Sequence, residues 1–293
     1  MQLETLGLAL NPCASISVQG GSEPPLFLVR APIKGAQFSE RLVKPDELPE
    51  AHGFLAAALI RGEPVDRISE QGIAELRDIG LLAPVDALPR AVAYDLGSDR
   101  LAGHVEVRDD AESRAHFERE GFAMLDGLLP ADEVVELGRY YQSLAEEGFL
   151  QLDDDRGSRR HVAHSHPVAD FWHRQLNERV SHLVGRATKP SYSFVSLYLE
   201  GGELKWHVDR PPCEYTITLL IDYAPLDEAG SSPWALKLRA RDGSTREIHQ
   251  RVGDALIFKG RELKHSREVL PEGHRSASLL FHFVDADYDG VMT

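Results

Sequence analysis

Residues 204–209 read Leu-Lys-Trp-His-Val-Asp, and this short run is the centre of the segment that decides the fold. The side chains of a β-strand point alternately to its two faces, so His207 and Asp209 are expected on the same face. An imidazole and a carboxylate placed in this way are a pair of candidate metal ligands. The run therefore predicts a strand that carries part of a metal site.

The strand pattern continues on both sides of this run. From residue 190 onward, turn residues separate eight short runs, a spacing typical of all-β sandwiches and barrels. The predicted strands are 191–200, 204–209, 214–223, 234–240, 245–251, 254–259, 264–269 and 276–284. We expect them to form a jelly roll, a double sheet that can enclose a ligand in its mouth. Candidate chemistry then belongs to the positions that face inward.

A third candidate ligand, His265, follows where the sixth predicted strand leads into the seventh. The strands between Asp209 and His265 allow the chain to return alongside the first two ligands. Two imidazoles and one carboxylate on one face of a metal leave three positions open, as in non-haem Fe(II) oxygenases. Arg275 follows ten residues later, and its guanidinium could hold a carboxylate through two parallel charge-assisted hydrogen bonds.

The order, spacing and strand context of these residues resemble the Fe(II)/2-oxoglutarate-dependent dioxygenases, which include prolyl hydroxylases and phytanoyl-type hydroxylases. The resemblance covers residues 112–290. Two longer stretches are similar to the prolyl-hydroxylase branch. The first is Tyr198-x-x-Gly201 leading to His207-x-Asp209, and the second is Gly-Asp-Ala-Leu-Ile-Phe at 253–258 leading to His265 and Gly-His-Arg at 273–275.

The resemblance implies a role for each matching residue. His207, Asp209 and His265 would bind Fe(II), and Arg275 would receive the C5 carboxylate of 2-oxoglutarate. Tyr198 would donate a hydrogen bond to the same cosubstrate. One position departs from the family pattern, because many relatives carry Ser or Thr two residues after the Arg, where this chain has Ala277. The implied reaction uses O2 to hydroxylate an unactivated carbon and releases succinate and CO2.

The expected substrate is an amino acid or an amino-acid residue within a peptide. Arg210, Glu214 and Trp206 flank the predicted ligands and are candidate substrate contacts. Two alternatives remain open: use of the same cofactors for desaturation or cyclisation in natural-product biosynthesis, and a non-catalytic sensor module that binds metal and 2-oxoglutarate. Halogenation is disfavoured, because related halogenases have Gly or Ala at the position of Asp209.

Two further groups among the 13 histidines are interpreted as lying outside the metal site. The segment 161–166 contains three of them and ends before a proline, so it is predicted to be a polar loop over the mouth of the active site. His282 lies on the last predicted strand and points opposite to Arg275 by strand alternation. It is interpreted as a hydrogen-bonded structural residue.

Residues 1–105 have a different pattern and are predicted to form an N-terminal accessory α+β domain. Strand-like runs at 15–18 and 26–29 flank Gly20-Gly21, and helical patterns follow at 49–61 and 68–79. This outline resembles the small domains that bind leader peptides in the maturation of ribosomal peptides. Peptide binding and dimerisation, which would make the chain a homodimer, are both open for it.

Residues 106–293 would form the oxygenase domain, a double-stranded β-helix that is cupin-like. A short strand at 121–125 and helices at 111–120, from 130 to the stop at Gly148, and 171–184 are expected before the barrel, and the helices would form a support layer. The fold class is therefore α+β, with most of the second domain in β-strands.

Composition excludes several classes of partner. The chain has 47 acidic and 32 basic residues and a net charge of −15, a surface that repels nucleic-acid phosphates and anionic lipid headgroups. We therefore expect a small-molecule or peptide substrate, with no nucleic acid and no membrane. Two cysteines 200 positions apart form no disulfide framework, and no targeting signal is recognised, so a cytoplasmic location is expected.

Overall fold

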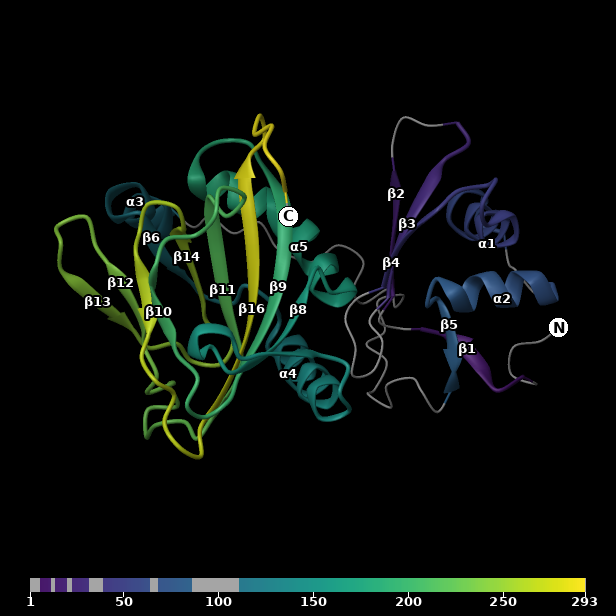
Figure 1. Cartoon of the computed structure of the whole chain (residues 1–293). Coiled ribbons are helices and arrows are strands. Elements are labelled where there is room, and N and C mark those ends of the chain that lie inside the picture. Colours follow the sequence, from purple (N-terminus) through teal and green to yellow (C-terminus); the bar gives the residue numbers. More distant parts are fainter. Residues whose placement is uncertain are drawn as a thin grey trace. The chain divides into compact units, whose positions relative to one another are not determined.

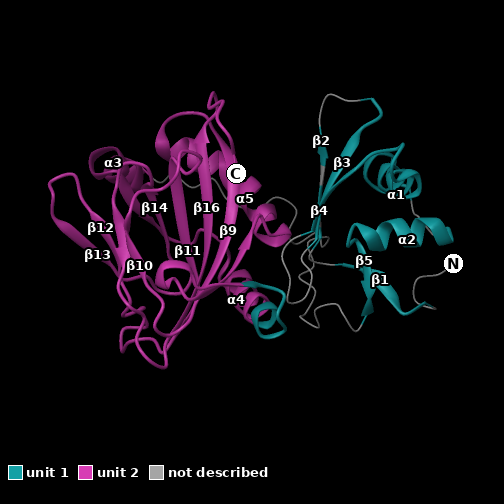
Figure 2. Cartoon of the chain, in the orientation of Figure 1, with its two compact units in different colours: residues 1–93, 143–151 teal, residues 94–142, 152–293 magenta. Residues whose placement is uncertain are grey.

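The computed structural model describes residues 6–11, 14–19, 23–31, 39–63, 68–85 and 111–292. The chain divides into two compact units, one of residues 1–93 with 143–151 and one of residues 94–142 with 152–293 (Figure 2). The domain boundary predicted at 105/106 falls in a stretch outside the described residues, as does Cys13. That boundary stays a prediction.

The first unit contains a three-stranded antiparallel sheet and two helical segments. Its elements are β1 (Leu8–Leu10), β2 (Ser15–Gln19), β3 (Leu26–Ala31), β4 (Ser39–Val43), α1 (Pro49–Leu55), a π-helix (Ala56–Arg61), α2 (Glu70–Asp78) and β5 (Leu82–Pro84). The sheet has the order β2-β3-β4, and β1 pairs with β5. The expected hairpin and both helical segments are present, but β1, β4 and β5 were not predicted. In β4 the signal is weak because three of its five residues are exposed.

Side-chain caps fix the helices of this unit. The Ser69 hydroxyl accepts a hydrogen bond from the Gly72 N–H at the start of α2, which satisfies a backbone donor that the helix itself leaves free. Glu75 of α2 accepts hydrogen bonds from the N–H groups of Glu50 and Ala51 at the start of α1. The two helices therefore hold one another through backbone capping as well as through the buried core.

The second unit is built on the predicted double sheet, and all eight predicted strands form (Figure 1). Their bounds are β9 (Thr188–Tyr198), β10 (Leu204–His207), β11 (Tyr215–Ala224), β12 (Leu236–Arg239), β13 (Thr245–Ile248), β14 (Ala255–Lys259), β15 (His265–Arg267) and β16 (Arg275–Asp285). The small sheet has the order β10-β15-β12-β13, and the large sheet includes β14-β11-β16-β9. The chain passes back and forth between the two sheets, which is the winding of a jelly roll.

Three further strands extend the large sheet, which has the full order β6-β14-β11-β16-β9-β8-β7. They are β6 (Phe122–Leu125), β7 (Gln151–Asp153) and β8 (Arg160–His164). The interpretation of segment 161–166 as a loop over the site was wrong, since most of it is β8, paired antiparallel with β9. The segment was not recognised as a strand because its histidines interrupt the alternation of apolar and polar residues by which strands are recognised.

Three helices accompany the second sheet system: α3 (Ala111–Glu120), α4 (Ala131–Glu146) and α5 (Pro167–Val184). Helix α5 packs on β9 and β16, and α3 packs on β6 and α5, which gives the expected helical layer. Gly138 of α4 comes so close to β11 that a Cβ there would lie 2.7 Å from the Ile221 carbonyl oxygen. No helix among the described residues is long and apolar enough to cross a membrane.

The register of β16 decides which of its side chains face the interior of the double sheet. Ser276 and Ser278 are paired with Tyr198 and Ser196 of β9, and directly paired residues share a face. The alternate residues Phe281 and Phe283 point the other way and lie 5.7 and 4.6 Å, between ring centroids, from His173 of α5. The even-numbered residues of β16 therefore face inward, and the odd-numbered ones face the helices.

Candidate metal centre

A cavity of about 300 Å³ lies between the two sheets of the second unit. It is lined by apolar side chains, three arginines, hydroxyls and histidines: Arg160, Tyr192, Phe194, Ser196, Tyr198, Leu204, His207, Val208, Asp209, Arg210, Cys213, Thr216, Thr218, Trp234, Leu236, Phe258, His265, Arg267, Ser278, Leu280 and His282. An apolar cavity with a few converging polar groups is the usual form of a small-molecule site.

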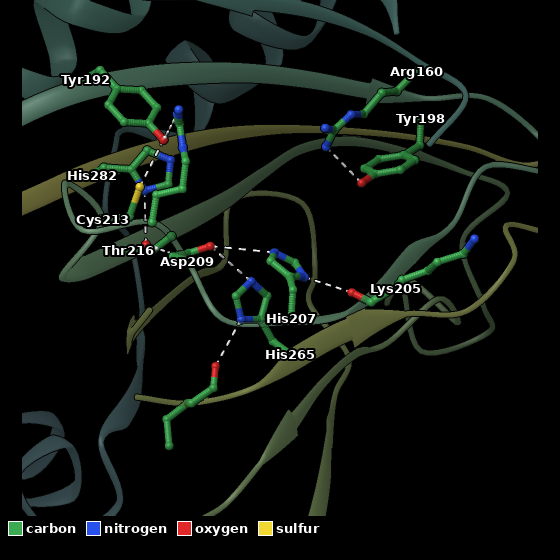
Figure 3. Close-up of polar contacts among 12 residues, drawn as sticks. Arg160, Tyr192, Tyr198, Lys205, His207, Asp209, Cys213, Thr216, His265 and His282 are labelled. Carbon is green, nitrogen blue, oxygen red and sulfur yellow. Dashed lines mark hydrogen bonds and ion pairs between the residues drawn. The ribbon is translucent and has the colours of Figure 1, made fainter. Parts of the chain in front are cut away.

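The three predicted metal ligands meet in this cavity (Figure 3). The Nε2 atoms of His207 and His265 lie 3.6 and 3.5 Å from Oδ1 of Asp209, and one ligand atom from each residue lies within 4.8 Å of the others. His207 ends β10, Asp209 follows it, and His265 begins β15, where it is paired with His207. Antiparallel pairing therefore brings together residues that are far apart in the sequence.

Backbone carbonyls orient both imidazoles. Nδ1–H of His207 donates to the Lys205 carbonyl at 2.8 Å, and Nδ1–H of His265 donates to the Leu263 carbonyl at 3.1 Å. A carbonyl only accepts, so each neutral ring carries its proton on Nδ1 and leaves the Nε2 lone pair free. The two lone pairs then face the Asp209 carboxylate, which is the donor set required for a divalent cation.

Asp209 is fixed from two directions. Its backbone N–H donates to the Gly260 carbonyl at 2.8 Å, and the Thr216 hydroxyl donates to its Oδ2 at 2.7 Å. The Thr216 oxygen in turn lies 3.0 Å from Nδ1 of His282. Because the hydroxyl proton is used on the carboxylate, Nδ1–H of His282 is the donor in this second bond. His282 is therefore a structural histidine, as predicted, but it lies on the cavity side of β16.

Charge within the cluster favours a bound cation. Burial alone would raise the pKa of Asp209, but its interactions with His207 and His265 outweigh burial and hold that pKa well below its usual range. The interaction with Asp209 raises the pKa of His207 above its ordinary value. An ionised carboxylate facing two imidazole nitrogens is stabilised by positive charge, and a divalent metal supplies that charge without protonating the rings.

A second set of potential ligands, Asp209 with Cys213 and His282, also lies within 4.8 Å. It fits a metal less well, because burial raises the pKa of the Cys213 thiol to about 11 and only the thiolate is a good ligand. The Cys213 sulfur lies 2.9 Å from the Tyr192 hydroxyl, and Nδ1 of His282 is already bonded to Thr216. The set of His207, Asp209 and His265 is therefore the better metal site.

The structure does not place Arg275 in the cavity, contrary to the prediction that it binds 2-oxoglutarate there. Its Nε donates to Oδ2 of Asp222 at 2.9 Å, and its side chain is 54% exposed. Arg275 is an odd-numbered residue of β16, so strand alternation turns it to the face that also carries Ala277. The departure at Ala277 therefore has no bearing on the cavity.

The other predicted contacts divide between the cavity and the surface. Tyr198 and Arg210 line the cavity. Trp206 is 44% exposed. The Arg239 guanidinium lies over it, 5.2 Å from the centroid of the Trp206 ring. The Glu214 carboxylate accepts a hydrogen bond from the Asp285 backbone N–H. Neither residue lines the cavity: Trp206 is next to His207 on β10 and points to the other face, whereas Glu214 precedes β11 and its carboxylate is directed to Asp285.

Sequence reasoning missed two arginines of the cavity. Arg160 begins β8, whose other residues lie in the segment 161–166 that was predicted to be a loop, and its Nη1 donates to the Tyr198 hydroxyl at 3.0 Å (Figure 3). Arg267 follows His265 by two residues on β15 and lines the same cavity. Strand alternation could have found Arg267, because it shares a face with a predicted metal ligand.

We expect Thr216→Val to weaken metal binding by 10- to 100-fold, about the usual effect of removing a partner of a metal ligand. Valine keeps the shape of threonine but leaves Oδ2 of Asp209 and Nδ1–H of His282 without their bond. Isothermal titration with Mn(II) under anaerobic conditions measures the effect. The matched control is Thr218→Val, which removes a cavity-lining hydroxyl from the same strand and should change metal affinity less than threefold; equal effects would contradict a role for the Thr216 bond.

No protein-family model matches the sequence, and no curated protein matches it. Among solved structures, SnoK, a non-heme alpha ketoglutarate dependent carbocyclase from nogalamycin biosynthesis, has a TM-score of 0.52 and 11% identity over 64% of this chain and 88% of its own. A Pseudomonas putida prolyl-4-hydroxylase has a TM-score of 0.49 and 17% identity, over 60% and 98% of the two chains. AviO1 from Streptomyces viridochromogenes Tue57 has a TM-score of 0.49 and 20% identity, over 62% and 98%. The likeness to SnoK shows that this chain shares the fold of that protein.

Proposed function

We propose that this chain is an Fe(II)- and 2-oxoglutarate-dependent oxygenase that hydroxylates an unactivated carbon and releases succinate and CO2. The observation that supports it is the meeting of His207, Asp209 and His265 within one cavity, with Nε2 of both rings free and directed to the carboxylate. This donor set on one face of a metal is typical of non-haem Fe(II) oxygenases. The fold shared with SnoK, itself described as alpha ketoglutarate dependent, supports the same class.

In this proposal each group of the cavity has a task. His207, Asp209 and His265 hold Fe(II), and Thr216 and the backbone of Gly260 keep the carboxylate in place. Iron and 2-oxoglutarate, when bound, supply the oxidising chemistry in the presence of O2. The protein supplies position and the exclusion of water, and the apolar walls of the cavity perform both tasks.

The substrate is proposed to enter at the Arg210 side of the cavity. Arg210 donates to the Tyr192 hydroxyl at 2.8 Å, and its guanidinium lies 5.4 Å from the Tyr192 ring centroid. An arginine held by an aromatic ring can bind a carboxylate or a peptide carbonyl. An amino acid or an amino-acid residue in a peptide fits this surface, and the substrate carbon to be hydroxylated would lie beside the metal.

The test uses the full-length chain without O2. Addition of Fe(II) and 2-oxoglutarate should produce the weak visible charge-transfer band of a chelated 2-oxo acid, and His207→Ala should remove it. Admission of O2 should then release succinate, measured by chromatography, and candidate amino acids should increase the rate. The exposed His182 of α5 provides the control, because His182→Ala should keep both signals.

The outcomes separate the alternatives. A band without succinate release, with any amino acid or peptide offered, would favour the sensor module. Succinate release with an oxidised product that has gained no oxygen would favour desaturation or cyclisation, and SnoK is itself described as a carbocyclase. Absence of the band in the wild-type protein would overturn the proposal.

A further inference from the structure

Arg267 is a buried cation without an acidic partner. It is only 7% exposed and lines the cavity. Its two hydrogen bonds go to neutral groups: Nη1 donates to the Trp234 carbonyl at 2.8 Å, and Nη2 donates to Oε1 of Gln250 at 3.2 Å. No Asp or Glu within the described ranges forms an ion pair with it. Burial of a charge costs free energy unless an opposite charge compensates it. A bound anion would provide that compensation for Arg267.

The guanidinium is also held rigidly. It lies 4.7 Å from the centroid of the Trp234 ring. Gln250, which accepts from it, is itself fixed, since Nε2 of Gln250 donates to the carbonyls of Thr218 and Asp254. A guanidinium has five N–H donors, and two of them are used here. The remaining donors form a preorganised fork that matches a carboxylate.

Three other arginines are less suitable for a buried anion. Arg160 is already paired with Asp153, whose Oδ2 lies 3.0 Å from its Nε. Arg210 lies against Tyr192, which Figure 3 shows on the far side of the metal ligands from Tyr198. Arg275 is outside the cavity and paired with Asp222. Of these four arginines, Arg267 alone combines deep burial with the lack of a carboxylate partner among the described residues.

The surroundings of Arg267 add neutral donors. Tyr198 packs against the same Trp234 ring, with the centroids 5.0 Å apart, and its oxygen already accepts from Arg160. Its own hydroxyl proton is therefore available to a ligand. The buried Ser196 hydroxyl, on the same face of β9, has no hydrogen-bond partner among the described residues. An orphaned hydroxyl in a cavity is a group that a polar ligand can satisfy.

The spacing to the metal site fits a short dicarboxylate. His265 and Arg267 are alternate residues of one strand, so they share a face and their Cα atoms are about 7 Å apart. Four C–C bonds of about 1.5 Å place the two carboxyl carbons of an extended five-carbon diacid about 5 Å apart. A diacid held at the metal by one end can therefore present its other end to Arg267.

We infer that Arg267, and not Arg275, binds the C5 carboxylate of 2-oxoglutarate in this chain, with the Tyr198 hydroxyl as a second donor. The inference rests on the proposed function. The residue that binds the C5 carboxylate then lies on β15, two positions after the metal ligand His265. Arg275, at the start of β16, has no role in cosubstrate binding. The family resemblance assigns that task to Arg275 instead.

The test compares two 2-oxo acids in anaerobic titrations of the Fe(II) protein, followed by the visible band and by calorimetry. 2-Oxopentanoate has the chain length of 2-oxoglutarate but a methyl group in place of the C5 carboxylate. We expect Arg267→Gln to weaken 2-oxoglutarate binding by about 100-fold, since it leaves the C5 carboxylate buried without its cation. The same variant should bind 2-oxopentanoate within threefold of the wild-type affinity, which also shows that its fold and metal site are intact.

The matched variant Arg275→Gln should leave both affinities unchanged. Arg267→Lys keeps the charge but loses the fork, so we expect a loss of about tenfold, and it serves as the measured variant if Arg267→Gln does not fold. Unchanged 2-oxoglutarate affinity in the Arg267 variants, or a loss in Arg275→Gln, would overturn the inference while leaving the proposed function standing. Failure of the wild-type protein to bind 2-oxoglutarate would instead overturn both.

Discussion

Gly260→Ala should destabilise the second unit by about 3 kcal/mol, at the upper end of the usual cost of overpacking, and should weaken metal binding by at least about tenfold. A Cβ at this position would collide with Oδ2 of Asp209 and would lie 2.6 Å from the Cys213 carbonyl and 2.8 Å from the Thr216 hydroxyl. Oδ2 of Asp209 and the Thr216 hydroxyl that donates to it both belong to the metal site, and the Cys213 carbonyl is backbone, so relief of the clash displaces Asp209 or shifts the main chain. Urea unfolding and Mn(II) titration measure the two effects.

The control for this variant is Gly53→Ala, because Gly53 lies in helix α1 and has open space around it. Alanine is a better helix former than glycine, so this change should leave stability equal or raise it by up to about 1 kcal/mol. Metal affinity should not change. A Gly260→Ala protein with wild-type stability and wild-type metal affinity would show that the close approach at Gly260 does not hold Asp209.

His265→Ala should lower Fe(II) affinity by at least about 100-fold, because loss of a ligand exceeds the 10- to 100-fold effect of losing a ligand's partner. Release of succinate from 2-oxoglutarate should fall below detection. His265 is buried and lies against the His207 ring, with the centroids 4.2 Å apart, so the alanine variant also leaves a cavity beside the metal. Calorimetry with Fe(II) under anaerobic conditions gives the affinity.

Cys213→Ser distinguishes the two possible ligand sets. If His207, Asp209 and His265 bind the metal, this variant should keep Fe(II) affinity within threefold. A large loss in Cys213→Ser together with a small loss in His265→Ala would move the metal to Asp209, Cys213 and His282. The exposed His182→Ala variant again controls for the loss of an imidazole that binds nothing.

The sequence predicted the double sheet well, because period-2 patterns separated by turn residues depend only on local chemistry. It also predicted that His207 and Asp209 lie close together, because alternate residues of an extended stretch point to the same side; the strand itself ends at His207, and Asp209 follows it. His265 was predicted to return alongside the first two ligands because several strands separate it from Asp209. The antiparallel pairing of β10 with β15, in which His265 lies opposite His207, is what brings it there.

The error at Arg275 has a physical cause. Alternation shows which residues of β16 share a face, but it does not show which face points into the cavity. A shift of one residue exchanges the inward-facing and outward-facing sets. Both faces of this strand are buried. The face with Ser276, Ser278 and His282 lines the cavity side, and the more apolar face with Phe281 and Phe283 packs on α5. The more polar face of a fully buried strand was the available signal for the ligand site.

The carbonyls that orient His207 and His265 belong to residues 205 and 263, each two positions earlier in the same stretch of chain. Main-chain oxygens are present whatever the side chain, so these two hydrogen bonds do not depend on the side chains of the cavity walls, although Phe258 of the wall packs on the His265 ring, with the centroids 4.8 Å apart. Substitutions at wall positions such as Phe194 or Leu280 can therefore alter which molecule fits without disturbing the metal ligands. Under the proposed function, this architecture separates the residues that would hold the metal from those that would select the substrate, so the range of substrates can change over evolution while the metal site is retained.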